Sequence, residues 1–582
     1  MKKLKNLFLV LFISGSSFGQ NADLSYSIRA IVIDSLSAKP IPFASLYVEG
    51  SSNGTISNYQ GEVELEGVHK EDVLICSYTG YDKKSIAAKF AIHADTIYLT
   101  RSAQLIDEVM VLADDAFLYD LILESKKTQS TKPRTSKTYF ELETFEGEQQ
   151  LELFQAYYNG SYSGYEVNGL ALKNGRCALS PTTKRVFISI ATSKVMYMHK
   201  LFQESDYFPT NPMELKRRKL FKYYQLRLSS KYIDNNSRTI YKILCVPKID
   251  DGKYFETAVW IDSASSQLLK VSLKINDAQR HPFELWAGNH DPDDVDIEIT
   301  KTYLELEGKM YVQSIDFDYS FTHISQFDST YNMNTRAILY AYDYTNEFDL
   351  PLFRETKDHY NSDYHRIQMI PYHNAFWKCT NEFKIKNDAV HENTFLADSS
   401  TFSSTDLRGR YGLGGDDRQL LTPFKTWSKN RIRLRNTREE TTFSTAPTIA
   451  ARQYNLKALL YLDINELCDS LQFTSATVFD TYESYYHLPI NNQSLAFINL
   501  YFDLMEIQRR KLDMKLNACK NLQEMKAAYQ EILAASNVLT EKYIKEVQRG
   551  TNWASFVEWN ALVVNELGID NISFFGLSNE EE

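Results

Sequence analysis

Short runs of alternating apolar and polar residues, separated by turn residues, fill the chain between Tyr26 and Val111. Residues 61–65 alternate as a half-exposed strand does, whereas residues 73–76 are more continuously apolar. Asn53-Gly54 and Gly80 suit tight connections between strands, because glycine adopts positive φ at little cost. This pattern predicts an N-terminal seven-stranded β-sandwich over residues 24–112.

Residues 113–136 change period and predict a helix followed by a linker. Residues 114–127 carry a mixed apolar stripe, and Lys126-Lys127 suit the C-terminal end of a helix, where the helix dipole favours positive charge. Residues 129–136 are polar and include Pro133, which predicts a linker.

From Thr138 to about Tyr342 the pattern is again mostly β, and the strands are longer. Gly252, Asp262-Ser263 and Glu307-Gly308 mark turns between them. The expected strands lie at residues 138–145, 151–158, 238–246, 255–262, 268–275, 295–304 and 309–321. Consecutive antiparallel strands in meander order predict a large curved antiparallel sheet over residues 137–350.

The C-terminal third changes to a helical period. Residues 351–450 are irregular and polar, but from Gln493 onward apolar residues recur at helical spacing, through residues 500–516 and 521–548. Gly550 ends this run, and Thr551-Asn552 suit the cap of a third helix. The pattern predicts a helical hairpin or bundle over residues 451–582 and, for the whole chain, an α+β multidomain fold.

Residues 1–20 have the parts of a secretory signal peptide. A basic start at Lys2, Lys3 and Lys5 precedes the short apolar run 7–13 and small residues before a cut near Gly19 or Gln20. This run is too short to span a bilayer as a helix, and no later segment is long and apolar enough. We therefore expect an exported chain with no transmembrane span after signal removal.

Several motifs of the first module permit a comparison with a known family. They are the Asn53-Gly54-Thr55 turn, Gly61, Tyr78-Thr79-Gly80-Tyr81 and Asp107-Glu108-Val109-Met110-Val111. With them, residues 27–112 resemble the carboxypeptidase-regulatory-like domain, a transthyretin-type sandwich. In Bacteroidota that domain often precedes TonB-dependent outer-membrane receptors and related envelope proteins, and the resemblance implies a non-catalytic module. Gln60 stands where the family usually has Asp before Gly, which puts any polar or ion contact of that Asp in question.

The strands around Trp260 carry a second resemblance. Residues 241–247, Val259-Trp260-Ile261-Asp262 and residues 268–270 resemble the lipoprotein-carrier type of curved sheet found in uncharacterised Bacteroidota envelope proteins. A concave apolar face of such a sheet would bind a lipid or a partner's peptide. The alternative is that the chain's own helices fill the concavity.

Charge indicates which partners to expect. A net charge of −11 argues against nucleic acid as the main partner. Residues 216–219, with Lys222, Arg227 and Lys231, form a basic cluster that suits anionic lipid head groups. Residues 284–298 are acidic and are either a Ca²⁺ site or a solvated acidic turn; they lack the loop glycine and terminal glutamate of an EF-hand.

Residues 431–435 alternate arginine with apolar residues. This period of two predicts an edge strand with one basic face. The alternative is a contact with an acidic partner or with lipid.

The candidates for catalytic chemistry are few. His281-Pro282-Phe283-Glu284 is an HxxE, the pair that a metallocarboxypeptidase uses on zinc, and it would need a distant third ligand such as His391. Pro282 interrupts any strand or helix that would place both ligands. Residues 412–417 are glycine-rich but lack a strand-to-helix context, so they suit a flexible loop. Tyr364-His365 and Tyr372-His373 suit packing or surface positions better than metal ligation.

The six cysteines are Cys76, Cys177, Cys245, Cys379, Cys468 and Cys519, and they form no CxxC pair, which excludes a zinc knuckle. An exported chain permits disulfides, and we expect Cys76 to be a buried small hydrophobe. The sequence thus assigns no catalytic, cofactor-binding or metal-ligating residue.

These patterns predict a non-enzymatic accessory or binding protein of the cell envelope. We expect it in the periplasm or associated with the outer membrane, where it contacts a protein partner or lipid. The alternatives are an envelope hydrolase with an unidentified site and a carrier that holds a hydrophobic ligand on the curved sheet.

Overall fold

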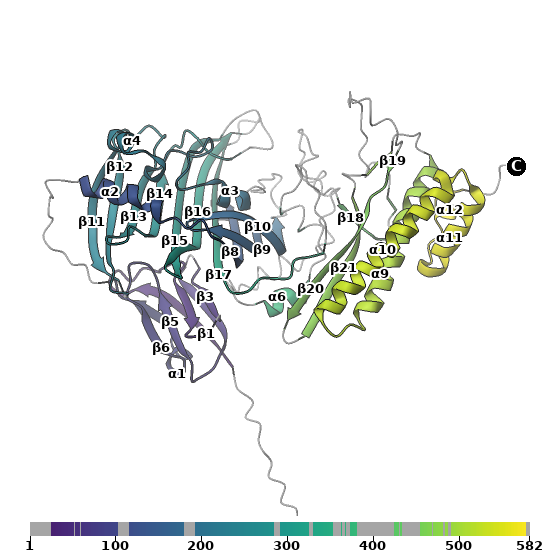
Figure 1. The fold of residues 1–582 in the computed structure, drawn as a ribbon, viewed down its shortest axis with the longest axis horizontal. Helices are drawn as coiled ribbons and strands as arrows, with labels where there is room; N and C mark the ends of the chain where they lie inside the picture. Colours follow the sequence, from purple (N-terminus) through teal and green to yellow (C-terminus); the bar gives the residue numbers. More distant parts are fainter. Residues whose placement is uncertain are drawn as a thin grey trace, which may run out of the picture. The chain divides into compact units, whose positions relative to one another are not determined.

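The computed structural model describes residues 25–102, 116–179, 192–283, 292–324, 330–352, 373–380, 424–432, 454–486 and 491–577, apart from a few residues inside these ranges, together with residues 363 and 367. The chain forms two compact units (Figure 1). One reaches to Tyr78 and continues over Lys83–Thr100, and the other takes in Thr79–Asp82 and most of the chain from Arg101 onward. The expected signal peptide at residues 1–20 lies outside the described residues.

The first unit is built on two small sheets, with the orders β4-β1-β7 and β3-β2-β5-β6. Its strands are β1 (Tyr26–Asp34), β2 (Ser45–Val48), β3 (Gly54–Ile56), β4 (Glu62–Val68), β5 (Val73–Ser77), β6 (Lys84–Ala87) and β7 (Thr96–Leu99), with α1 (Ala88–Ala91) before β7. Alternate residues such as Ile28, Val32, Leu46 and Leu74 form its core. The predicted seven-stranded sandwich is confirmed, although the expected strand at residues 108–111 lies outside the described residues.

Gly54 and Gly80 are glycines for different reasons. Gly80 has a φ of +94°, as its expected place in a tight connection requires. Gly54 begins β3 without a positive φ, and a Cβ there would lie 2.9 Å from the Cβ of Tyr47 on the paired strand β2. Close approach of two strands, rather than turn geometry, therefore excludes a side chain at Gly54.

A ten-stranded antiparallel sheet dominates the second unit, with the order β10-β9-β8-β17-β16-β15-β14-β13-β12-β11 (Figure 1). Its strands are β8 (Pro133–Glu146), β9 (Gln149–Ser163), β10 (Glu166–Leu179), β11 (Tyr224–Ile233), β12 (Thr239–Pro247), β13 (Glu256–Asp262), β14 (Leu268–Ile275), β15 (Asp293–Leu306), β16 (Lys309–Ile324) and β17 (Thr330–Asp343). The predicted large antiparallel sheet is confirmed. The predicted linker over residues 129–136 is wrong in part, because β8 begins at Pro133, and the first residue of a strand is a position that tolerates proline.

The strand order departs from a simple meander. β11 to β17 follow one another, but β17 then pairs with β8 from the start of the region. Across this pair the hydroxyl oxygens of Thr144 and Thr335 lie 3.1 Å apart, although 191 residues separate them in sequence. β10, β11 and β17 are not among the expected strands; in β10, Gly169, Asn174 and Gly175 are turn-type residues that obscure the strand pattern.

One face of this sheet packs against the chain's own helices. α2 (Ala116–Ser125), α3 (Thr192–Met198) and α4 (Arg217–Tyr223) supply Leu118, Met196 and Leu220 to the buried core of that face. Two short turns of 3-10 helix, η1 (Lys126–Thr128) and η2 (Pro212–Glu214), lie beside them in sequence. The sheet curls, since β9 lies near β16 although β8 and β17 separate the two strands in the order. The helix-filled interior is the arrangement that we gave as the alternative to an open concave face.

The opposite face is covered at β8 and β9 by α6 (Asn374–Cys379). Tyr157 on β9 is buried there, with its ring 5.5 Å from the ring of Phe376. The guanidinium of Arg176 on β10 lies 4.1 Å from the ring centre of Trp377. Both faces of this end of the sheet are therefore buried.

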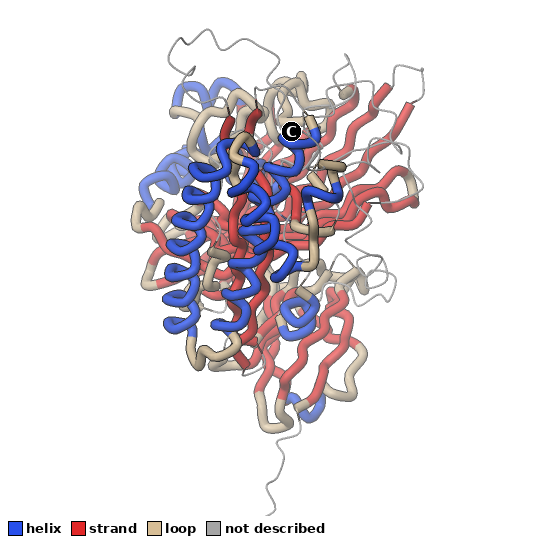
Figure 2. The backbone as a smooth tube through the Cα atoms, turned by 90° about the vertical axis from the view of Figure 1, so that its right-hand side faces the viewer, coloured by secondary structure: helices blue, strands red, loops and turns tan. Residues whose placement is uncertain are grey.

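Figure 2 shows helices beside strands in the C-terminal part. β18 (Phe424–Thr426), β21 (Ser470–Asp480) and β20 (Ala458–Leu467) form a three-stranded sheet, and β19 (Tyr454–Asn455) pairs with β22 (Tyr485–Tyr486). The helices are α9 (Asn492–Leu516), α10 (Leu522–Val547), η5 (Gln548–Gly550), α11 (Trp553–Leu567) and α12 (Asn571–Phe574). α9 lies against β20 and β21, and α10 and α11 lie against α9. The predicted C-terminal helices are confirmed, but residues 451–582 are not purely helical, because strands occupy much of residues 454–486.

Asparagine caps fix the starts of these helices. The side chains of Asn491, Asn521 and Asn552 each accept a backbone N–H three residues later, and the last of these is the predicted cap. None of the helices in the described ranges has the length and apolarity needed to cross a bilayer.

Candidate functional site

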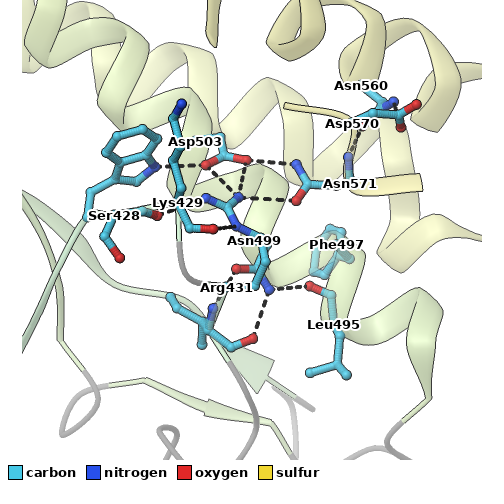
Figure 3. Close-up of polar contacts among 12 residues, drawn as sticks. Ser428, Lys429, Arg431, Leu495, Phe497, Asn499, Asp503, Asn560, Asp570 and Asn571 are labelled. Carbon is cyan, nitrogen blue, oxygen red and sulfur yellow. Dashed lines mark hydrogen bonds and ion pairs between the residues drawn. The ribbon is translucent and has the colours of Figure 1, made fainter. Parts of the chain in front are cut away.

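A dense polar network surrounds Asp503 on α9 (Figure 3). Arg431 Nη1 donates to Asp503 Oδ1 at 2.9 Å and to Oδ2 at 2.7 Å. Trp427 Nε1 donates to Oδ1 at 2.8 Å, and Asn571 Nδ2 donates to Oδ2 at 2.7 Å. The side chains of Arg431 and Asp503 are only 3% and 0% exposed. A carboxylate has about four acceptor positions, so all of those on Asp503 are in use.

The rest of the Arg431 guanidinium is satisfied as well. Nη2 donates to the carbonyl of Ser428 at 2.9 Å, and Nε donates to that of Lys429 at 3.2 Å. The next residue, Ile432, exchanges two backbone hydrogen bonds of 2.7 and 2.9 Å with the side-chain amide of Asn499 (Figure 3). We call this arrangement the Asp503 clamp, because it holds Trp427, Arg431 and Ile432 against α9 and α12.

The clamp corrects the predicted basic edge strand at residues 431–435. Arg431 and Ile432 are buried and lie outside any strand, while residues 433–435 lie outside the described residues. The reason is the ion pair, since burial of an arginine is costly unless a carboxylate meets it. Because its donors and acceptors are consumed within the chain, the clamp stabilises the fold and has no group left to act on a substrate.

A second buried ion pair joins the large sheet to the C-terminal sheet. Lys173 Nζ on β10 donates to Asp463 Oδ1 on β20 at 2.6 Å and to the carbonyl of Ile464 at 3.0 Å, and it also contacts the carbonyl of Asp349. Burial lowers the pKa of Lys173, an effect that the nearby Asp463 carboxylate opposes. His373, before α6, lies in the same electrostatic environment, and burial lowers its pKa. Lys173 and Asp463 therefore link two parts of the second unit.

A third polar cluster lies within the core of the large sheet. Lys301 on β15 donates to the carbonyl of His199 at 2.9 Å, and its Nζ lies 3.7 Å from Glu166 Oε2. Among the described residues, neither ring nitrogen of His199 nor the hydroxyl of Tyr303 has a hydrogen-bond partner. Burial lowers the pKa of Lys301 and holds that of His199 well below its ordinary value. Unlike the Asp503 clamp, this cluster leaves buried polar atoms unsatisfied.

The described residues bring no set of predicted metal candidates together. His281 stacks on Phe283 with ring centres 5.6 Å apart, while Glu284 and His391 lie outside the described residues. Asp293, Asp294 and Asp296 of the acidic segment belong to β15, and the described residues contain no group of three or more side chains suited to a metal ion. Residues 364–365, 372 and 412–417 also lie outside the described residues. Cys76 is fully buried as predicted, and burial raises the pKa of its thiol to about 12.

Of the predicted basic cluster, residues 216–219 and 222 lie on and beside α4, whereas Arg227 and Lys231 lie on β11. Lys216, Arg217, Arg218, Lys219 and Lys222 are exposed, and Leu220 between them is fully buried. Arg217 pairs with Asp120 on α2, whereas none of the other four cations forms an ion pair within the described ranges. The cluster therefore presents unneutralised charge to solvent.

In the sandwich, the loop before β4 is fixed from within. The carbonyl oxygen of the Asn58 side chain accepts the backbone N–H groups of Gln60 at 3.0 Å and Glu62 at 2.9 Å. Asn58 is buried, whereas Gln60, at the position where the family usually has Asp, is exposed. The loop is thus shaped by Asn58 and not by the residue that departs from the family pattern.

The buried Lys301 cluster has a sign in the sequence, namely the alternation of apolar and polar residues along β15. Ile297, Ile299, Lys301 and Tyr303 share one face of β15, so the pattern places Lys301 on an apolar face. Nothing comparable marks Asp503, whose partner Arg431 is 72 residues away.

No curated protein matches this chain. Among solved structures, the chain is similar to a putative outer membrane lipoprotein-sorting protein domain from Vibrio parahaemolyticus, with 10% identity, a TM-score of 0.18, and coverage of 39% of this chain and 90% of that chain. It is also similar to the MucA/MucB complex of Pseudomonas aeruginosa (10% identity, TM-score 0.15, 38% and 93% covered). A LolA superfamily protein from Nitrosomonas europaea is a further similar structure (9% identity, TM-score 0.15, 39% and 94% covered). At these TM-scores the likenesses carry no argument about function.

The first unit, in contrast, matches the model of a known family. The family model of the CarboxypepD_reg-like domain matches residues 29–111, which include all seven strands of the sandwich except the start of β1. The chain therefore carries a carboxypeptidase-regulatory-like domain in its first unit.

Proposed function

We propose that this protein is a non-enzymatic binding protein of the cell envelope, acting at or near the outer membrane as an accessory to a partner. The observation that carries the proposal is the carboxypeptidase-regulatory-like sandwich at residues 29–111. Modules of that family are non-catalytic and often stand beside outer-membrane receptors. The sandwich is followed by a second unit that contains the large antiparallel sheet.

The second unit supports binding over catalysis. Asp503 accepts four hydrogen bonds from the chain itself, and Lys173 contacts three acceptors of the chain. Groups so fully paired are poor acids, bases or nucleophiles, because any reaction must first break buried hydrogen bonds.

The second unit also favours an accessory over a carrier of a hydrophobic ligand. The curved sheet packs its apolar face against α2, α3 and α4, which share one core with it. A ligand on that face would have to displace side chains such as Leu118 and Leu220, which are at most 1% exposed. Contacts with partners therefore fall on outer surfaces.

Two features of the chain support a location outside the cytosol. Residues 1–20 have the composition of a secretory signal. Cys379 at the end of α6 is disulfide-bonded, and disulfides persist in oxidising compartments such as the periplasm.

The proposal is tested by fractionation of cells of the source bacterium that express the tagged full-length protein, followed by cross-linking and purification from native membranes. We expect a chain trimmed near Gly19 or Gln20, found with the outer-membrane or periplasmic fraction and cross-linked to an envelope protein. The matched control is the same chain without residues 1–20, which should remain cytosolic and lose that cross-link. An untrimmed cytosolic wild-type chain would refute the proposal, and so would hydrolytic activity of the purified protein that follows its concentration.

A further inference from the structure

One end of the large sheet carries an exposed surface of mixed basic and apolar side chains. We define the α4 surface by Lys216, Arg218, Lys219, Phe221, Lys222, Lys248 and Ile249. Phe221 is 37% exposed and Ile249 is 58% exposed.

The α4 surface is held rigidly by the core beneath it. Leu220 is fully buried, and the ring of Phe221 stacks on that of Tyr119 of α2 at 3.8 Å. Lys248, after β12, donates its backbone N–H to the carbonyl of Tyr223 at 2.8 Å and its Nζ to that of Phe221 at 2.6 Å. These bonds place Ile249 beside the C-terminal end of α4. The charged and apolar groups thus belong to one fixed surface.

The charge of this surface is opposite to that of the chain. The whole protein has a net charge of −11, yet Lys216, Arg218, Lys219 and Lys222 form no ion pair within the described ranges. At physiological salt, charges more than about 8 Å apart are largely screened. Asp120 pairs with Arg217 and Asp251 with Lys253, and the exposed Asp250 beside Ile249 offsets only one of these charges. A surface in contact with this end therefore senses a local positive charge.

We propose that the α4 surface docks on the anionic head groups of a phospholipid bilayer. Clustered lysines and arginines are attracted to such a bilayer, and flanking aromatic and aliphatic side chains enter its interfacial layer. The combination of cations that form no ion pair within the described ranges with the exposed Phe221 and Ile249 matches these requirements, whereas a purely acidic protein partner would use the cations alone. This inference rests on the proposed function, because a place in the envelope brings the chain against a bilayer surface, and it identifies that bilayer as a second binding partner.

The test is co-sedimentation of the full chain with vesicles of phosphatidylglycerol and phosphatidylcholine, compared with vesicles of phosphatidylcholine alone. We expect binding to the mixed vesicles only, weakened by added salt. Each cation near a charged membrane contributes about 1 kcal/mol, or about fivefold in affinity. The triple variant Arg218→Glu/Lys219→Glu/Lys222→Glu should therefore bind at least about a hundredfold more weakly.

The matched control is Lys511→Glu/Lys520→Glu/Lys545→Glu, which makes the same change of charge at exposed positions of the C-terminal helical region. It should bind nearly as the wild type does. A separate variant, Ile249→Ser, should retain the salt dependence but bind several-fold more weakly, because it removes apolar area without changing charge.

Three outcomes would overturn the inference: no binding of the wild type to the mixed vesicles, equal loss in the two triple variants, or loss of a protein cross-link in the α4 variant without any change in vesicle binding. The last outcome would assign the α4 surface to an acidic protein partner. In each case the proposed envelope function would still stand if the trimmed chain remained in the envelope fraction and kept a protein partner, so the two failures are distinguishable.

Discussion

Arg431 and the cations of α4 come from similarly basic stretches of sequence, yet the structure treats them in opposite ways. Arg431 is buried and paired with Asp503, whereas Arg218, Lys219 and Lys222 are exposed and have no acidic partner among the described residues. The difference lies in whether a carboxylate from another part of the chain reaches the cation. A run of basic residues therefore does not show by itself whether its side chains are buried or exposed. That depends on whether a carboxylate from a distant part of the chain pairs with them.

The sharpest way to test this comparison is to remove the carboxylate of the Asp503 clamp. The substitution Asp503→Ala should lower the free energy of unfolding of the second unit by about 3–5 kcal/mol, because it leaves Arg431 buried without a counter-charge. Urea unfolding followed by the fluorescence of Trp427 and its neighbours would measure the loss. The control Arg431→Met/Asp503→Leu removes both charges and should recover part of the stability. The remaining loss reflects the donors of Trp427 and Asn571, which no longer have an acceptor. A loss below about 1 kcal/mol for Asp503→Ala would mean that solvent reaches the pair.

The stability that the cluster of His199, Lys301 and Glu166 contributes to the fold should depend on pH. His199 is buried beside Lys301 and Lys200, with Glu166 next to Lys301, and burial keeps its folded-state pKa well below the ordinary value of 6.5. The folded state therefore binds this proton less readily than the unfolded chain does. The stability contributed by neutral His199 is complete above pH 6.5 and is lost as the pH falls below that value.

Thermal unfolding of the wild type and His199→Leu between neutral and mildly acidic pH would measure this effect. The leucine variant should lose less stability on acidification, and at neutral pH it should gain about 1 kcal/mol, because it removes two buried nitrogens without partners. Parallel pH profiles of the two proteins would show that folding does not change the affinity of His199 for its proton.

The smallest expected effect on stability is that of substituting the exposed cations of α4. The Arg218→Glu/Lys219→Glu/Lys222→Glu variant should change the free energy of unfolding by no more than about 0.5 kcal/mol per site, since these side chains support no buried partner. The same urea titration provides the measurement, with Leu220→Ala as the contrasting variant. Leu220 is fully buried on the same helix, and its truncation should cost about 2–5 kcal/mol. If the exposed triple variant lost as much as Leu220→Ala, the cations of α4 would be structural.

Local patterns predicted much of the fold, because a strand or helix that buries one face must repeat its apolar residues. The sandwich, the antiparallel sheet and the C-terminal helices all follow from such repeats. The pairing of β17 with β8 does not, since it depends on chain closure across 191 residues and on no feature near Thr144 or Thr335. β20 and β21 are missing from the prediction, because the helical domain predicted for residues 451–582 includes them.

The candidate sites differ in the same way: a site made of adjacent residues is visible in the sequence, whereas a site made of distant residues is not. The exposed cluster of α4 was identified correctly, because Lys216 to Lys219 are adjacent in sequence and need no partner to be recognised. Arg431 was assigned to a surface strand, because its partner Asp503 lies 72 residues away and looks like an ordinary helical aspartate. Lys173 stands among the turn-type residues of β10, so its buried role was hidden as well.

The β8–β17 pairing also has a consequence for biogenesis. The chain is synthesised from its N-terminus, so β8, β9 and β10 emerge well before the strand that completes their sheet. Until β17 arrives, β8 has an open hydrogen-bonding edge, and such edges invite association with other chains. The newly made polypeptide should therefore depend on a chaperone during this interval, and a truncation before Thr330 should be prone to aggregation rather than fold as a smaller sheet.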